Sequence, residues 1–299
     1  MKNTLISCSQ RRLTVCSWIA RIALIVAALA TGLANVAQSG GIAYDPFNYS
    51  PAGSPVAGDG GNGSFGFSST WYGDGSFTVA ASNLPSPVPL PASISNSVTA
   101  AAFGANRNLS RDLTQPLGAD NTTAFFSFVM EPQGTVGDGA FEGWFGFALL
   151  AGARNIVVGK DSFHGTFSLT DNLGDPSVET NIPVVSGQSH LFVLETDFHP
   201  GNDTYKLYID PATGQPQPAT PAATLDFDLQ TIPTIGFAGP GAFGFDELRI
   251  GTTWADVTPT PEPESAILAS AGFLLLVVLR IYRARRRLVR VYARHTLSG

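Results

Sequence analysis

Two carboxylates placed two residues apart, Glu195 and Asp197, have the spacing in this chain that most suggests catalytic chemistry. They lie in the alternating stretch HLFVLETDF at 190–198, which predicts a β-strand, and alternate residues of a strand share one face. Retaining glycosidases use two carboxyl groups about 5–5.5 Å apart as nucleophile and acid/base. The next three residues are FHP, so no second glutamate follows at the right spacing. We therefore interpret Glu195 and Asp197 as a solvated strand face and predict that the chain is not an enzyme.

The histidines and cysteines predict neither a metal site nor a nucleophile. His164, His190 and His199 open or close predicted strands, and no HxH or HExxH spacing occurs, so we interpret each as a surface or turn residue. Cys8 and Cys16 are the two cysteines of the chain. The remainder therefore has no disulfide, thiolate ligand or cysteine nucleophile.

Aspartates beside glycines at 58–61, 73–77 and 201–203 are of the type that supplies oxygen ligands to calcium. The same pairs are first of all turn signals, and no EF-hand pattern is present. We expect no cofactor and keep calcium as a candidate without a favoured set of ligands.

Large aromatic residues beside amides and carboxylates are typical of carbohydrate recognition. Trp71 and Tyr72 border a glycine turn, which makes them the best candidates for exposure and for binding a ligand. Trp144 lies inside an apolar segment and is predicted to be in the core. For each of these aromatics, core packing is the alternative role.

Short alternating segments separated by turn residues predict an all-β fold with antiparallel strands. We find no helical periodicity longer than a couple of turns between 42 and 257. The clearest predicted strands are at 122–131, 143–151, 155–160, 165–170, 190–198, 203–210, 224–229 and 242–251. The segments at 190–198 and 203–210 are joined by a turn and predict a long hairpin.

This hairpin, the early AYDPFNY, the stretch GGNGSFGFSSTWYGDG and the closing GFDELRIGTTWADVTP together resemble concanavalin A-like or laminin-G-like jelly-roll sandwiches. The resemblance implies a β-sandwich over 42–257 in which the first and last strands pair. Laminarinase-type glycosidases with this fold carry Glu-x-Asp-x-x-Glu, of which this chain has only Glu195 and Asp197. A divergent glycoside hydrolase or lyase is therefore the alternative to a non-enzymatic, glycan-binding domain.

The charge is distributed unevenly along the chain. The span from 45 to 258 contains 21 of the 23 acidic residues but six of the 17 basic ones, for a formal charge of −15. Such an acidic body repels the phosphate backbone of nucleic acids, so we expect no nucleic-acid partner.

The N-terminal residues 1–37 have the features of a secretory signal peptide. Lys2, Arg11, Arg12 and Arg21 precede the uncharged stretch IALIVAALATGL, and small residues follow. The apolar stretch is shorter than the roughly 20 residues that a membrane-spanning helix needs. We therefore predict export.

The C-terminal part divides into a proline-rich spacer at 258–265, an apolar segment at 266–282 and a basic tail at 283–299. The apolar segment predicts a short transmembrane helix. The positive-inside rule then places the basic tail in the cytoplasm and the acidic body outside. The arginines that set this topology are Arg280, Arg283, Arg285, Arg286 and Arg287.

The tripeptide Pro261-Glu262-Pro263, the apolar segment after it and the arginine cluster resemble the PEP-CTERM sorting domain of exported bacterial proteins. The resemblance implies an exosortase as sorting enzyme and delivery to the cell envelope or extracellular matrix, where extracellular polysaccharide is a candidate partner. The chain would span the membrane once before processing. Twelve residues follow the arginine triplet, more than is usual in that family, and a simple membrane anchor is the alternative.

Overall fold

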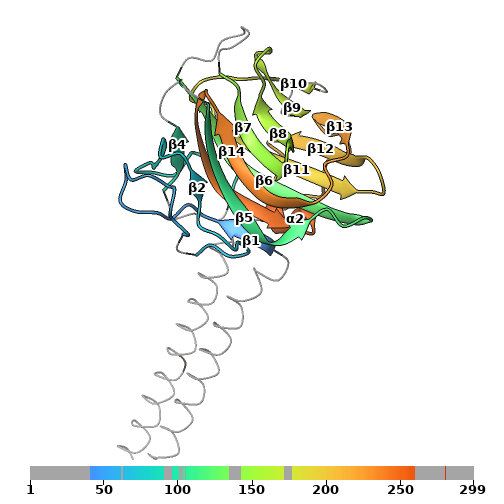
Figure 1. Ribbon diagram of the computed structural model, residues 1–299, viewed down its shortest axis with the longest axis horizontal. Coiled ribbons are helices and arrows are strands. Elements are labelled where there is room, and N and C mark those ends of the chain that lie inside the picture. Colours follow the sequence, from blue (N-terminus) through green and yellow to red (C-terminus); the bar gives the residue numbers. More distant parts are fainter. Residues whose placement is uncertain are drawn as a thin grey trace, which may run out of the picture.

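The computed structural model describes residues 41–61, 63–90, 96–100, 104, 106–134, 143–171, 177–259 and 280. These residues form two antiparallel sheets packed face to face (Figure 1). The signal segment 1–37, the sorting motif at 261–263 and, apart from Arg280, the apolar segment and the arginine cluster lie outside the described residues. Within the described part of the chain, no helix is long and apolar enough to cross a membrane.

The first sheet, sheet I, contains eight strands, and the first and last strands of the sandwich pair in it. Gly41 lies opposite Gly251 and Asp45 opposite Leu248, which confirms the pairing expected from the sequence. The strands in order across the sheet are β13 (Ala223–Phe227), β12 (Asp203–Ile209), β11 (His190–Phe198), β6 (Thr122–Gln133), β15 (Ala242–Gly251), β4 (Val98–Ala100) and β3 (Phe77–Val79), with β1 (Gly41–Asp45) also beside β15. The predicted hairpin is the pair β11 and β12.

The second sheet, sheet II, contains seven strands, and four of them, β2, β5, β10 and β14, are not among the strands predicted from the sequence. The order is β10 (Ser177–Pro183), β9 (Thr166–Asp171), β8 (Arg154–Lys160), β7 (Phe145–Ala151), β14 (Ile232–Gly239), β5 (Arg107–Leu117) and β2 (Tyr72–Gly73). In the sandwich region that the structure describes, the single helix is the four-residue α2 (Trp254–Val257). The all-β, two-sheet antiparallel class is therefore confirmed.

Phenylalanines from alternate positions of both sheets fill the interior. Phe237 of β14 stacks on Phe245 of β15 with ring centroids 3.5 Å apart, and Phe128 of β6 lies 4.7 Å from Phe147 of β7. All four side chains are fully buried. Because successive side chains of a strand point to opposite faces, the residues between these phenylalanines point away from the core.

The outer face of sheet I is covered by other parts of the chain. A second hydrophobic cluster on it includes Val193, Trp254 and Val257, and Leu84, Val88 and Leu90 pack against this cluster. The segment around 84–90 and helix α2 therefore shield this face from solvent.

Candidate functional site

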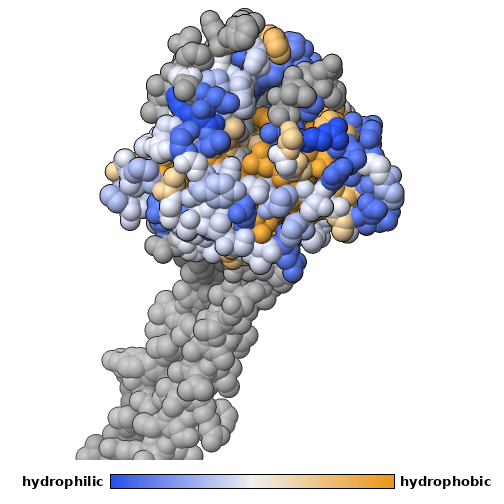
Figure 2. Space-filling view, in the orientation of Figure 1, coloured by the Kyte–Doolittle hydropathy of each residue, from blue (hydrophilic) through white to orange (hydrophobic). Residues whose placement is uncertain are grey.

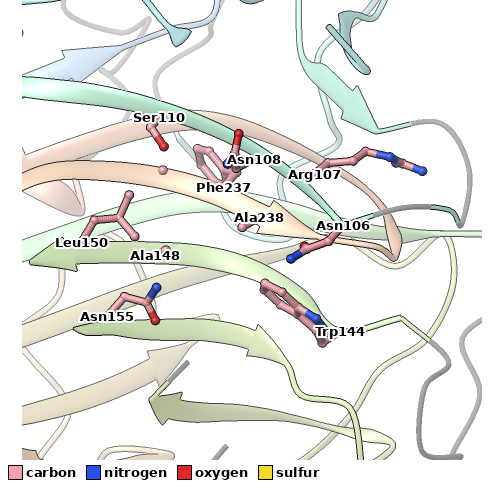
Figure 3. A pocket seen from close by; sticks show the side chains of 11 residues that line it. Asn106, Arg107, Asn108, Ser110, Trp144, Ala148, Leu150, Asn155, Phe237 and Ala238 are labelled. Carbon is pink, nitrogen blue, oxygen red and sulfur yellow. The ribbon is translucent and has the colours of Figure 1, made fainter. Parts of the chain in front are cut away.

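A groove of about 310 Å³ lies on the outer face of sheet II, over β5, β14, β7 and β8 (Figure 3). We call it the sheet II groove. Its lining residues are Asn106, Arg107, Asn108, Ser110, Trp144, Ala148, Leu150, Asn155, Gly236, Phe237 and Ala238. Figure 2 shows one face of the molecule hollowed near its centre, with hydrophobic residues in the hollow and hydrophilic residues around it.

Small residues form the floor of the sheet II groove. Gly146 and Ala148 of β7 lie opposite Ala238 and Gly236 of β14. A Cβ atom added to Gly236 would lie 2.6 Å from a neighbouring backbone carbonyl, closer than real Cβ contacts, so this position requires glycine. The floor is therefore largely backbone, and a flat ligand can approach it closely.

One aromatic side chain and three amides surround this floor. Trp144, just before β7, is half-buried and lies with Asn106 at one end of the group, whereas Leu150 lies toward the other end (Figure 3). Asn108 is exposed on β5. The Oδ1 atom of Asn155 on β8 is buried and has no hydrogen-bond partner among the described residues. An aromatic plane beside amide donors and acceptors can stack on one face of a sugar ring and bind its hydroxyl groups.

The expectation that Trp144 is a core residue is wrong. Trp144 occupies the same phase of its strand as Gly146 and Ala148, and this phase points outward because Phe145 and Phe147 fill the core. The small residues that alternate with the phenylalanines were the sequence signal for an open face. Trp144 is the functional candidate that the sequence reasoning missed.

Trp71 is fully buried, with 0% of its surface exposed, which corrects the expectation that it is accessible to a ligand. Its Nε1 atom donates hydrogen bonds to Asp45 Oδ2 at 2.9 Å and to Tyr49 Oη at 2.8 Å. Asp45 also forms a buried ion pair with Arg111 of β5. Trp71 therefore serves to dock the segment that contains it onto the sandwich.

Tyr72, the other aromatic candidate, is 44% exposed. It lies on β2 at the edge of sheet II, opposite Ser110 of the groove lining. Its hydroxyl donates to Asp112 Oδ1 at 2.7 Å, and the hydroxyl of Thr234 donates to the same oxygen at 2.7 Å. Burial and then this hydrogen bond to Asp112 raise the pKa of Tyr72. Tyr72 thus remains accessible beside the sheet II groove, whereas Trp71 does not.

Glu195 and Asp197 share a face of β11, but they lie on sheet I and not beside the sheet II groove. Lys206 Nζ donates to Glu195 Oε1 at 3.1 Å and to Asp197 Oδ2 at 2.7 Å. Glu195 is only 7% exposed, so the interpretation of this face as solvated is wrong for Glu195. Tyr208 and Gln217 donate to its other oxygen.

The protonation of Asp197 does not suit an acid catalyst. Burial opposes ionisation, but hydrogen bonds from Lys206 and Thr123 outweigh it and lower the pKa of Asp197. A general acid in glycoside hydrolysis needs a raised pKa. The Glu195–Asp197 pair is therefore an ion-pair network on sheet I.

Two of the histidines, His164 and His190, have structural partners. His164 lies in a turn, where Nδ1 is 2.7 Å from Asp161 Oδ2 and Nε2 is 3.1 Å from Glu179 Oε1. His190 is only 3% exposed and pairs with Asp210 at 2.6 Å, so the surface interpretation is wrong for it. Among the described residues, no three His, Cys, Asp or Glu side chains are grouped as a metal ligand set.

Two of the aspartates considered as calcium ligands accept hydrogen bonds from nearby backbone groups. Asp74 accepts from the backbone N–H groups of Ser76 at 3.0 Å and Asn108 at 3.1 Å. Asp203 accepts from the backbone N–H of His199 at 3.1 Å. These bonds are those of turn residues.

Comparisons with known proteins add little beyond the sandwich. No protein-family model matches the chain, and no curated protein sequence matches it. Among solved structures, it is similar to an endo-1,3-β-glucanase from Streptomyces sioyaensis, with 12% identity, a TM-score of 0.41, and coverage of 69% of this chain and 94% of that one. The globular domain of calreticulin from T. cruzi gives 12% identity, a TM-score of 0.41, and coverage of 71% and 95%. The lectin UEA-II in complex with galactose gives 12% identity, a TM-score of 0.37, and coverage of 60% of this chain and 91% of that one. At these identities and TM-scores, the likenesses carry no information about the ligand or activity of this chain.

Proposed function

We propose that this protein binds glycans in the sheet II groove without cleaving them. The observation that carries the proposal is the half-buried Trp144 beside amide side chains over a floor of glycine and alanine. An aromatic side chain provides a large, rigid contact surface, and the amide of the exposed Asn108 offers a donor and an acceptor to the hydroxyl groups of a ligand.

The distribution of carboxylates supports binding rather than hydrolysis. None of the described lining residues of the sheet II groove is aspartate or glutamate. Glu195 and Asp197 belong to the other sheet and are held by Lys206. A glycosidase needs an acid and a base or nucleophile on either side of one glycosidic bond.

We further propose that the protein is exported and sorted to the cell envelope or extracellular matrix through its C-terminal tail. The signal-like residues 1–37 and the tail with Pro261, Glu262 and Pro263 support this part of the proposal. Extracellular polysaccharide is the glycan that a protein delivered there would meet. The exosortase and the membrane helix are parts of the same proposal.

A glycan array probed with the full-length chain tests the binding proposal. Wild-type protein should bind a defined group of glycans, and Trp144→Ala should lose this binding because it removes the aromatic contact. Phe163→Ala is the matched control, because Phe163 is an aromatic that is exposed outside the groove lining. Equal binding by wild type and Trp144→Ala would refute the site. Release of shortened glycans by the wild-type protein would refute a non-enzymatic role.

A further inference from the structure

We propose that the ligand of this face is a neutral polysaccharide chain that crosses the strands of sheet II, with a second aromatic subsite formed by Tyr72, Asp112 and Thr234. This inference rests on the proposed glycan function and extends it to the class of ligand. It assigns a role to the exposed tyrosine at the edge of the sheet, which does not line the sheet II groove.

Strand pairing connects this second subsite to the groove without a gap. Tyr72 lies opposite Ser110, Ser110 lies opposite Gly236, and Gly236 lies opposite Ala148. The three residues that follow Tyr72 across the sheet, Ser110, Gly236 and Ala148, all line the groove. In the next row, Asp112 lies opposite Thr234, which in turn lies opposite Leu150.

The distance between the two aromatic residues requires a ligand of several sugar rings. Tyr72 and Trp144 are separated by three strand-to-strand steps, or about 14 Å across the sheet. Trp144 also lies four residues before Ala148, or about 13 Å along β7. The separation is therefore roughly 20 Å, which a chain of sugars can span and one ring cannot.

The hydrogen bonds around Asp112 leave an acceptor available for hydroxyl groups. Tyr72 and Thr234 both donate to Oδ1, while Oδ2 has no side-chain donor among the described residues. A carboxylate oxygen held in this way accepts hydrogen bonds from sugar hydroxyls. It also repels the carboxylate of an acidic sugar.

The charge at the other end of the face does not favour an acidic glycan either. Arg107 lines the groove, and its positive charge contributes to a lowered pKa of Asp74, together with hydrogen bonds from Ser76 and Asn108 that outweigh burial. Arg107 is therefore balanced by a neighbouring carboxylate. A neutral glycan fits both ends.

Binding of oligosaccharides of increasing length tests the inference. The probes are cello-, laminari- and manno-oligosaccharides from disaccharide to octasaccharide, with alginate oligosaccharides as the acidic class, titrated into the full-length chain. The affinity of the wild type for neutral chains should rise with chain length until one chain is long enough to contact both Trp144 and Tyr72. Tyr72→Ala and Asp112→Asn should each weaken binding of the long chains on the order of tenfold and leave the short chains unaffected. Tyr72→Phe keeps the ring, so comparison with Tyr72→Ala separates stacking from the hydrogen bond to Asp112.

The outcomes distinguish this inference from the function on which it rests. If Trp144→Ala abolishes binding while Tyr72→Ala and Asp112→Asn leave every length unchanged, the second subsite is refuted and the glycan site remains. Tighter binding of alginate than of the neutral chains would overturn the proposed ligand class. If Trp144→Ala also has no effect on any bound oligosaccharide, the proposed function itself fails.

Discussion

Asp246 should make the protein less stable as the pH rises from acidic to mildly basic values. Its side chain is only 1% exposed and lies beside an irregularity in the pairing of β15. Oδ2 accepts a hydrogen bond from the backbone N–H of Leu84 at 3.2 Å, and Oδ1 accepts one from that of Glu247 at 2.8 Å. Burial, followed by the negative charge of Glu247, raises the pKa of Asp246 to about 8.

The direction of the effect follows from the folded and unfolded pKa values of Asp246. Between the unfolded value of about 3.9 and the folded value, the folded protein keeps a proton that the unfolded chain has released. The stabilisation is fully present below about pH 4 and is lost as the pH rises through the folded pKa. Each pH unit within this window costs about 1.4 kcal/mol. A change from about pH 5 to about pH 8 therefore removes on the order of 4 kcal/mol from the free energy of unfolding.

Chemical denaturation of wild type and Asp246→Asn across this pH range measures the effect. Asparagine can still accept the bond from Glu247, but its Nδ2 atom faces the N–H of Leu84, at a cost of roughly 1–3 kcal/mol that does not depend on pH. Only the difference in slope is therefore informative, because distant titrating groups contribute equally to both proteins. Parallel curves for the two proteins would refute the account of Asp246.

Three further predictions concern other parts of the chain. Lys206→Met should lower the free energy of unfolding by about 1–3 kcal/mol, because it leaves Glu195 buried without its cation, and should not change glycan binding; lost binding would show that sheet I belongs to the site. The hydrogen bond to Asp161 raises the pKa of His164, so its stabilising contribution is full below about pH 6.5 and is lost at higher pH. The melting temperature of wild type should therefore fall relative to His164→Asn as the pH rises, and equal shifts would contradict this. Glu262→Ala should leave a longer, membrane-retained species in a strain with an active exosortase, and unchanged gel mobility would contradict the sorting proposal.

Much of the sandwich was predictable, because many of its strands alternate apolar and polar residues or are apolar throughout. Among the strands that the patterns missed, β5 and β14 carry much of the sheet II groove, and the reason for missing each can be identified. In β5 the inward position of Arg111 breaks the apolar alternation, and its charge is compensated by Asp45 from a distant part of the chain. In β14, Pro233 and the glycines weaken the strand signal. Because β5 and β14 carry much of the sheet II groove, missing them concealed the site.

The aromatic residues show the same limit of local patterns. Trp71 and Tyr72 are neighbours in a glycine-rich segment, yet one is buried against Asp45 and the other is exposed beside Asp112. Their different surroundings come from residues far away in the sequence, which no local pattern specifies. Trp144, in contrast, had a readable local signal, since it shares its strand face with small residues.

Hydroxyl-radical footprinting of the full-length chain, with and without a glycan that it binds, tests the central claim most directly. Bound glycan should protect Trp144 from oxidation and leave Phe163 as reactive as before, because only Trp144 lines the sheet II groove. Unchanged oxidation of Trp144 in the presence of bound glycan would contradict the claim that glycans bind on sheet II.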